Sequence, residues 1–520
     1  MMRKFFNTAG VCVPEEHYMV SMTPRFESLK KRIDNKRYFI LHAPRQTGKT
    51  TLMLQLMEAL NQEDKYIALY VNVEAAQPLR NNIEAVNELI VSEFEAKAAI
   101  YLRKDWQPQE DCFKIRSMSR GFSDFLSRWS LQLPKPLVVF MDEVDALIGD
   151  GLISVLRQLR NGYTQRPRAF PHALCLIGLR DIRDYRIYSD ASKRYIIGGS
   201  AFNIKDKSIR LNDFTLEQVK ALYAQHTEVT AQKFTHHALQ RIFDLTRGQP
   251  WLVNALGREL CFDEQAIDWK QTVHKADVET AAEILIVRRD VHLDQLADKL
   301  TEPRVARIIE SILVGEQASE TEAEYNLNED KQYLIDLGLV RSGERGLEIA
   351  NPIYREIIPR ELTAYQQDML GINPKWYVKP DGRLDIDKVL AAYIKFYKQH
   401  HELVTKRRTY TEAAHHLLLM AWLQRIVNGG GRINREYAAG LGRLDLCIEF
   451  ADERFAFELK LNRKEALSEG KEQLVDYLNR LSLDQGWLVI FSRKEVSDWD
   501  GVGKRESLLE GGKRIEVIWL

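Results

Sequence analysis

The sequence predicts a protein that is α/β in its N-terminal part and α+β at its C-terminal end. Three patterns support this prediction. Short apolar strands alternate with amphipathic helices up to residue 205, residues 210–365 have a mostly helical pattern, and strands return within residues 385–520. Because strands that alternate with helices are typical of βαβ units, the N-terminal sheet is predicted to be parallel.

Short apolar runs bounded by polar segments mark the strands of this N-terminal sheet. The four clearest runs occupy residues 37–43, 65–73, 137–143 and 173–180. Helical periodicity is clearest further along, at residues 216–226 and 236–248.

The length of the chain and its changes of pattern predict several domains. Two prolines in residues 373–383 favour a linker there. We expect a first domain over 1–205, a helical lid over 206–285, a small domain over 286–372, the linker over 373–384 and a C-terminal domain over 385–520.

The composition excludes several classes of protein. Lys plus Arg balances Asp plus Glu at 74 each, so no overall positive field favours nucleic acid. The five cysteines are widely spaced without a CxxC pair, which argues against a disulfide framework or a zinc knuckle. No apolar run approaches the roughly 18 residues of a membrane span, and the N-terminus makes a poor signal peptide. We therefore expect a cytoplasmic protein without a membrane partner.

A phosphate-binding loop follows the first predicted strand. Residues 43–50 read APRQTGKT and lead into an apolar helix. Backbone N–H groups of such a loop surround a polyphosphate, while Lys49 reaches the β- and γ-phosphates and Thr50 binds Mg²⁺. The first position is alanine where the usual pattern has glycine. The candidate ATP-binding residues of the loop are Ala43, Pro44, Arg45, Gln46, Thr47, Gly48, Lys49, Thr50 and Thr51.

Polar residues follow the later strands of the same sheet. Asp142 ends the strand LVVFMD, where open α/β sheets bind their ligands, so we expect it to hold Mg²⁺. Glu143 would polarise the attacking water, and Asp145 is expected to be a solvated or helix-starting acid. Arg180 either senses the γ-phosphate or is a surface arginine. Pro250 either faces the nucleotide or only begins a helix.

Four segments together resemble the AAA-type and STAND-type signalling ATPases: HAPRQTGKTT, VVFMDEVD, GLRD and the Gly248-Gln249-Pro250 corner. The resemblance implies a P-loop parallel-sheet ATPase with a helical lid, followed by a winged-helix domain that includes residues 336–362. It also implies a sensor role for Arg180. ATPases of this kind often act as homo-oligomers, and the sequence does not identify the trigger that would activate this one.

Two carboxylates and a lysine converge in the C-terminal domain. Because strand side chains alternate between faces, Asp445 points away from the apolar side of RLDLCIEF, and Glu458 and Lys460 point away from that of FAFELK. A hairpin joins the two strands and brings these side chains to one face. Paired carboxylates suit Mg²⁺ or Mn²⁺, and the lysine can position water or neutralise developing charge.

This constellation resembles the PD-(D/E)XK nuclease superfamily, with Asp445 and Glu458-Leu459-Lys460 as the core motif over residues 405–495. The resemblance implies a restriction-endonuclease-like domain. It also implies that Glu412, on a preceding helix, assists the site, and that Gln473 and Tyr477 on a following helix contact the substrate backbone. A solvated strand face without a catalytic role is the alternative.

Nucleic acid is the expected partner, and DNA is favoured over RNA. Lys406-Arg407-Arg408 and Arg288-Arg289 are either phosphate contacts or solvated charge runs. The leading hypothesis is an ATP-gated, metal-dependent nuclease, which by resemblance suits defence or mobile-element biology. A second hypothesis is an ATP-dependent signalling switch or adaptor whose nuclease-like domain only binds. A third, a DNA motor, lacks a recognisable helicase set.

Overall fold

The structure is a computed structural model, and it describes most of the chain. The described residues are 4–21, 23–114, 117–181, 186–189, 194–197, 202–264, 266–288, 299–300, 302–314, 324–343, 346–358, 377–400, 419–420, 422–423, 432–439, 442–461, 465–491 and 503–520.

The chain divides into two compact units. The first contains Met1–His292, Glu324–Gly343 and Ala350–Ile353, and the second contains Leu293–Ala323, Glu344–Ile349 and Tyr354–Leu520. The finer division into five segments stays a prediction.

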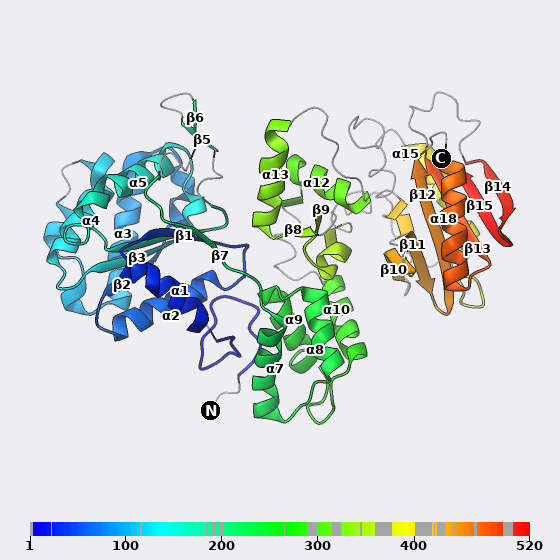
Figure 1. Ribbon diagram of the computed structural model, residues 1–520, viewed down its shortest axis with the longest axis horizontal. Coiled ribbons are helices and arrows are strands. Elements are labelled where there is room, and N and C mark those ends of the chain that lie inside the picture. Colours follow the sequence, from blue (N-terminus) through cyan, green and yellow to red (C-terminus); the bar gives the residue numbers. More distant parts are fainter. Residues whose placement is uncertain are drawn as a thin grey trace. The chain divides into compact units, whose positions relative to one another are not determined.

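A five-stranded sheet forms the centre of the first unit (Figure 1). Its strands stand in the order β2-β3-β4-β1-β7, and all neighbouring pairs are parallel, as the alternating pattern predicted. The strand β7 was not anticipated. The bounds are β1 Tyr38–His42, β2 Ile67–Asn72, β3 Leu137–Asp142, β4 Ala173–Gly178 and β7 Ser208–Arg210.

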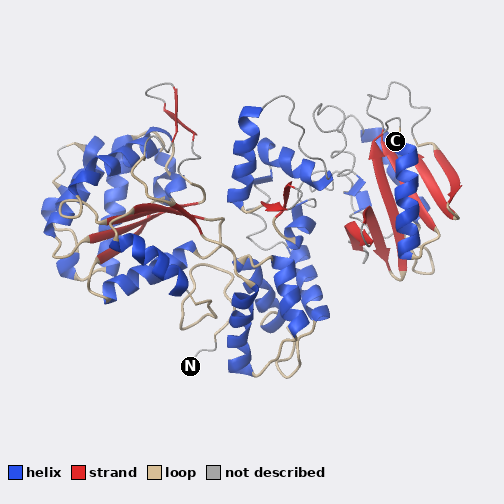
Figure 2. Ribbon diagram, in the orientation of Figure 1, coloured by secondary structure: helices blue, strands red, loops and turns tan. Residues whose placement is uncertain are grey.

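Helices cover both faces of this sheet (Figure 2). Because consecutive side chains of a buried strand point to opposite faces, Phe39 packs with Leu52 in one core, and Ile40 packs with Trp129 in the other. The first core includes the helices α1 Thr23–Asp34 and α2 Lys49–Gln62, and the second includes α3 Ile83–Tyr101, α4 Gly121–Gln132 and α5 Gly149–Gly162. The short 3-10 helices of this region are η1 Glu74–Leu79, η2 Lys104–Trp106, η3 Glu110–Phe113, η4 Met118–Arg120, η5 Val144–Ala146 and η6 Tyr163–Gln165.

Four helices follow, in the region predicted to be a helical lid. They are α7 Leu216–Thr230, α8 His236–Thr246, α9 Pro250–Cys261 and α10 Lys275–Arg288. The side chains of Thr215, Thr235 and Gln249 accept hydrogen bonds from the first turns of α7, α8 and α9, respectively. Pro250 begins α9, where its missing N–H removes no helical hydrogen bond.

Several further elements are described before the C-terminal sheet. They are β5 Arg186–Ser189, β6 Arg194–Ile197, α12 Pro303–Val314, α13 Glu324–Leu337, β8 Val340–Gly343, β9 Gly346–Ile349 and α15 Ile386–His400. A helix followed by two strands agrees with the local pattern expected there, but the winged-helix fold stays a prediction.

A six-stranded mixed sheet dominates the second unit, in the order β10-β11-β12-β13-β15-β14. β12 runs parallel to β13 and β13 to β15, and the other neighbours are antiparallel. The helix α18 packs on one face through Leu474 and Leu478, and Phe457 and Tyr397 belong to the core on the other face. The bounds are β10 Arg432–Ala439, β11 Gly442–Phe450, β12 Glu453–Leu461, α18 Ala466–Leu481, β13 Gln485–Phe491, β14 Arg505–Glu510 and β15 Lys513–Trp519.

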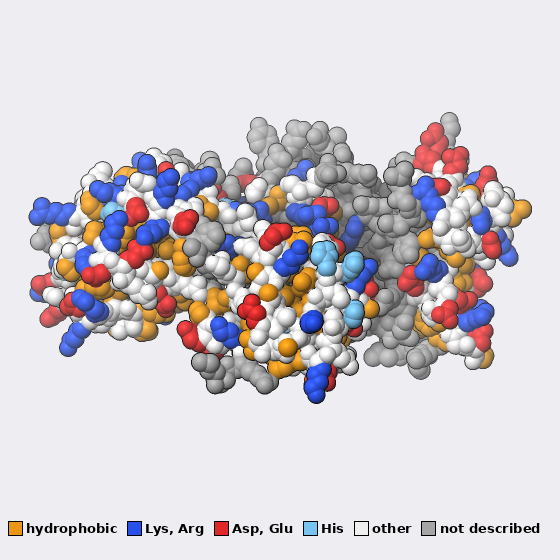
Figure 3. All heavy atoms as spheres, turned by 60° about the horizontal axis from the view of Figure 1, so that its bottom comes forward, with side chains coloured by type: hydrophobic (Ala, Val, Ile, Leu, Met, Phe, Trp, Pro, Cys, Tyr) orange, Lys and Arg blue, Asp and Glu red, His pale blue; other side chains and the backbone are white. Residues whose placement is uncertain are grey.

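Most strands of this sheet match the predicted segments, and β14 is an addition. Figure 3 shows basic and acidic side chains interspersed over the face in view, in keeping with the zero net charge. None of the helices in the described part of the chain combines the length and the apolar character that a membrane crossing needs.

Candidate functional site

The phosphate-binding loop connects β1 to α2. Gly48 and Gln46 have φ angles of 86° and 57°, so the loop uses left-handed backbone at two positions. Lys49 is buried, and its Nζ donates to the carbonyl oxygens of Ala43 and Pro44, both at 2.9 Å. Burial lowers the pKa of Lys49, and the charges of nearby acids, led by Asp142, oppose this effect. The ammonium is therefore held across the mouth of the loop, where a polyphosphate would be its stronger partner.

The predicted magnesium ligands lie together. The Thr50 hydroxyl donates to Asp142 Oδ2 at 3.0 Å, although 92 residues separate the two in the chain. The same oxygen accepts a hydrogen bond from the Tyr70 hydroxyl at 2.6 Å. Tyr70 lies on β2, beside β3, and was not predicted as a site residue. The one feature of the sequence that could have indicated this role is the position of a tyrosine near the carboxyl end of a mainly apolar strand.

Replacing Tyr70 with phenylalanine is expected to slow ATP hydrolysis by about tenfold, because a buried hydrogen bond to a carboxylate contributes about 1.5–3 kcal/mol. Asp142 would then lose one of the two hydroxyls that orient it. Steady-state hydrolysis measured against Mg²⁺ concentration checks this prediction. Tyr66→Phe is the matched control, because this buried tyrosine donates at 2.7 Å to Asp34, away from the loop. Equal rates for both variants would contradict a positioning role for Tyr70.

Glu143 occupies a strained backbone position directly after β3. Its φ is 56°, in the left-handed region that residues with a Cβ seldom adopt, and such strain often accompanies function. Burial and the charge of Asp142 raise the pKa of its carboxyl group. This combination suits a residue that polarises water.

Asp145 is less solvated than expected. It does lie in a first helical turn, that of η5, but its carboxylate accepts a hydrogen bond from the Leu179 backbone. A Cβ on Gly178 would lie 2.7 Å from this carboxylate, so the glycine leaves room for it. Burial raises the pKa of Asp145 to about 7. The acid thus links the end of β3 to the end of β4.

Arg180, the predicted sensor, already has a partner within the first unit. Its Nε lies 3.5 Å from Asp336 Oδ2 on α13, and its guanidinium lies 5.0 Å from the centre of the Tyr333 ring. The arginine is therefore neither a plain surface residue nor fully available to a phosphate in this arrangement.

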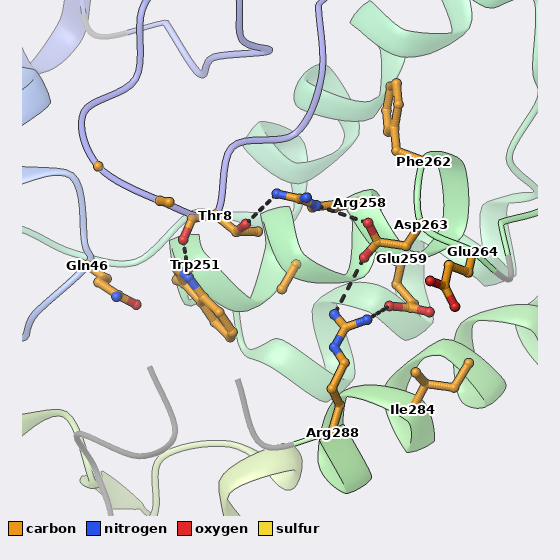
Figure 4. Close-up of a pocket in the computed structure, with 13 residues that line it drawn as sticks. Thr8, Gln46, Trp251, Arg258, Glu259, Phe262, Asp263, Glu264, Ile284 and Arg288 are labelled. Atoms are coloured by element: carbon orange, nitrogen blue, oxygen red, sulfur yellow. Dashed lines mark hydrogen bonds and ion pairs between the residues drawn. The ribbon is translucent and has the colours of Figure 1, made fainter. Parts of the chain in front are cut away.

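A cleft of about 910 Å³ lies between the N-terminal segment, the phosphate-binding loop and the helices α9 and α10 (Figure 4). Gln46 and Trp251 line this cleft. Trp251 directly follows Pro250, which was predicted either to face the nucleotide or only to begin a helix. The Trp251 indole donates to the Thr8 carbonyl at 2.8 Å, and the Cys12 backbone donates to the Thr51 hydroxyl at 3.2 Å. These contacts place the N-terminal segment over the loop, so the cleft adjoins the predicted nucleotide site.

Ion pairs close the far wall of this cleft. Arg288 binds Glu259 at 2.8 Å and Asp263 at 3.5 Å, and Arg258 binds Asp263 at 3.0 Å (Figure 4). Arg288 was considered as a phosphate contact, but the structure gives it acidic partners instead. Arg289 and residues 406–408 lie outside the described residues.

A second group of candidate residues lies on the face of the C-terminal sheet that α18 covers. Glu458 is only 2% exposed, and its Oε1 accepts from Lys460 Nζ at 2.7 Å. Asp445 Oδ2 accepts from the Leu459 backbone at 2.8 Å. The other carboxylate oxygen of Glu458, Oε2, is buried and has no hydrogen-bond partner among the described residues. Burial, followed by the charge of Asp445, raises the pKa of Glu458 to about 8.

The remaining predicted residues of this site are placed only in part. Glu412 lies outside the described residues. Gln473 is exposed on α18, whereas Tyr477 is buried in the core beneath that helix, so they do not form the common substrate-facing surface that was expected. Among the described residues, no three His, Cys, Asp or Glu side chains are grouped for a metal ion.

The comparison with protein families matches the part of the chain that precedes the C-terminal sheet. A family model described as an AAA-like domain matches residues 27–359 of the 520. No curated protein matches the chain. Among solved structures, a Walker-type ATPase of Pyrococcus abyssi is 13% identical, with 68% of this chain and 99% of that chain covered and a TM-score of 0.47.

Two further structures are similar over a comparable length. The RuvB Holliday junction branch migration motor of Thermotoga maritima is 14% identical, with 65% of this chain and 95% of that chain covered and a TM-score of 0.33. Cdc6p from Pyrobaculum aerophilum is 15% identical, with 67% and 95% covered and a TM-score of 0.35. Since the family match spans more than half of the chain and includes the phosphate-binding loop, the chain belongs to the AAA-like domain family and contains an ATP-binding P-loop ATPase domain.

Proposed function

We propose that the protein is an ATP-gated, metal-dependent nuclease that acts on DNA. The nuclease part of this proposal is supported by Glu458, whose buried Oε2 has no hydrogen-bond partner among the described residues. Glu458 lies on the sheet face that also holds Asp445 and Lys460. A buried carboxylate oxygen without a donor is costly, and a bound cation would remove that cost.

In the ATPase domain, the loop residues Thr47, Gly48 and Lys49 bind the phosphates, and the cleft beside Trp251 takes the base. The hydroxyl of Thr50 and the carboxylate of Asp142 fit Mg²⁺, because both are hard oxygen ligands already in contact at 3.0 Å. Glu143 orients the attacking water. Burial lowers the pKa of Lys49 in this arrangement, where its Nζ contacts two carbonyl oxygens. A bound phosphate would replace them with negative charge and so raise this pKa.

In the C-terminal domain, Asp445 and Glu458 fit a divalent cation, Mg²⁺ or Mn²⁺. The metal would supply an activated water and charge stabilisation for phosphodiester hydrolysis. Lys460, now paired with Glu458, would be released to face the scissile phosphate, where it neutralises developing negative charge. Gln473, exposed on α18, remains able to contact a DNA backbone.

The test is a cleavage assay with the full chain. Plasmid, linear duplex, single-stranded DNA and RNA are each incubated with Mg²⁺ or Mn²⁺, in the presence and absence of ATP. We expect metal-dependent cutting of DNA that Lys460→Ala abolishes. Lys471→Ala is the matched control, because this α18 lysine pairs with Glu510 at 2.8 Å, and Glu510 is not one of the two proposed metal ligands.

The alternative is an ATP-dependent switch or adaptor whose C-terminal domain only binds nucleic acid or protein. ATP binding without cleavage of any substrate in this assay would favour the alternative.

A further inference from the structure

A buried carboxylate on α13, that of Asp336, contacts the predicted sensor Arg180. The side chain of Asp336 is 0% exposed, and two partners are seen among the described residues. Its Oδ1 accepts a hydrogen bond from the Gln332 amide at 2.9 Å, and its Oδ2 forms an ion pair with Arg180 Nε at 3.5 Å. Burial raises the pKa of this carboxyl group, and the Gln332 hydrogen bond and the charges of Arg180 and Arg210 oppose the rise. Of these two partners, only Arg180 carries the positive charge that a buried carboxylate needs.

Two other contacts bring the C-terminal end of α13 onto the ATPase domain. The Arg210 guanidinium donates to the Ile335 carbonyl at 3.0 Å. Gly338, with a φ of 76°, packs so closely on the phosphate-binding loop that a Cβ there would lie 2.7 Å from the Pro44 ring. The end of α13 therefore contacts β7, the segment after β4, and the loop itself.

Arg180 lies close to the acids that follow β3, because the backbone N–H of the preceding residue, Leu179, donates to the Asp145 carboxylate. The positive charge of Arg180 acts on Asp145, as does that of Lys49, and Glu143 contributes a negative charge at the same place. A γ-phosphate bound next to Lys49 would therefore also attract Arg180. The γ-phosphate carries more negative charge than the single carboxylate of Asp336.

We propose that Asp336 competes with the γ-phosphate for Arg180, so that it determines the preference between ADP and ATP and couples the phosphate state to the docking of α13. This inference rests on the sensor role of Arg180 within the proposed function. ADP leaves Arg180 paired with Asp336. ATP draws Arg180 away and leaves the buried carboxylate with a neutral amide and the charge of Arg210, which is bound to the neighbouring Ile335 carbonyl. The loss of the Arg180 ion pair weakens the docking of α13.

Four proteins test the proposal: the wild type, Asp336→Asn, Arg180→Met and the double variant. Asparagine keeps the acceptor that Gln332 uses and removes the charge. The affinities for Mg-ATP and Mg-ADP are measured by calorimetry, and amide hydrogen exchange of residues 329–337 is measured with each nucleotide.

We expect Asp336→Asn to raise the ATP-to-ADP affinity ratio by about fivefold or more, the lower end of typical coupling between sites. In the Arg180→Met background the same substitution should leave the ratio unchanged, because the competing group is gone. In the wild type, ATP should speed exchange in α13 relative to ADP. The control is Asp181→Asn, which removes another buried acid, paired with Lys205 at 2.5 Å, and leaves Asp336 in place.

An unchanged ratio in Asp336→Asn, or the same rise with and without Arg180, would overturn the proposal. Arg180→Met that binds ATP and ADP like the wild type would instead refute the sensor role itself. A folded wild type that binds no nucleotide would refute the proposed function as a whole, so the three failures are distinguishable.

Discussion

Lys49→Ala is expected to weaken ATP binding by about a hundredfold or more. The ammonium would contact the phosphates through charge-assisted hydrogen bonds, each contributing about 1.5–3 kcal/mol, and two such bonds account for this loss. Lys49 is buried within the loop, so its ammonium group is already held at the phosphate position. Calorimetric titration with Mg-ATP measures the effect.

Lys30→Ala is the control for this variant. Lys30 lies on α1 in the same domain, exposed, and pairs with Glu63. Its loss should leave the ATP affinity within about twofold, because exposed ion pairs contribute little. Similar affinities for the two variants would contradict the assignment of the phosphate-binding loop.

Glu458→Gln is expected to reduce Mn²⁺ affinity at the C-terminal site by about a hundredfold, because one of two charged oxygen ligands is replaced by a neutral amide. The measurement is made without nucleotide and in the Lys49→Ala background, so that metal carried by ATP does not contribute. DNA cutting should fall with metal affinity.

Glu516→Gln serves as the comparison for Glu458→Gln. Glu516 lies on β15 of the same sheet, and its carboxylate pairs with Arg514 at 2.7 Å. This variant should bind Mn²⁺ like the wild type. Full Mn²⁺ affinity in Glu458→Gln would show that the carboxylates do not form a metal site.

The features that the sequence predicts best are local ones. The strands of the first sheet were visible as apolar runs, and the phosphate-binding loop as a contiguous segment with glycine and lysine at fixed spacing. Alternation along two strands likewise placed Asp445, Glu458 and Lys460 on one face, which the structure bears out. Each of these inferences needs only neighbouring residues.

The features that the sequence missed depend on distant residues. Tyr70 reaches Asp142 across 72 positions, and Asp336 meets Arg180 through a helix that lies far along the chain. No pattern near Tyr70 or Asp336 reports the partner. The burial of Tyr477 was missed for a related reason, since periodicity shows which residues share a helix face but not how deeply the sheet buries each one.

We expect the nucleotide state of the first unit to control DNA cutting by the second. The measurement is the initial rate of DNA cleavage in Mg²⁺, with ATP, with ADP and without nucleotide, for the wild type and Lys49→Ala. We expect ATP to raise the wild-type rate above the rates in the other two conditions, because the α13 contact is released. Lys49→Ala should show no response to ATP. Equal wild-type rates in all three conditions, or an ATP response that survives in Lys49→Ala, would contradict this expectation.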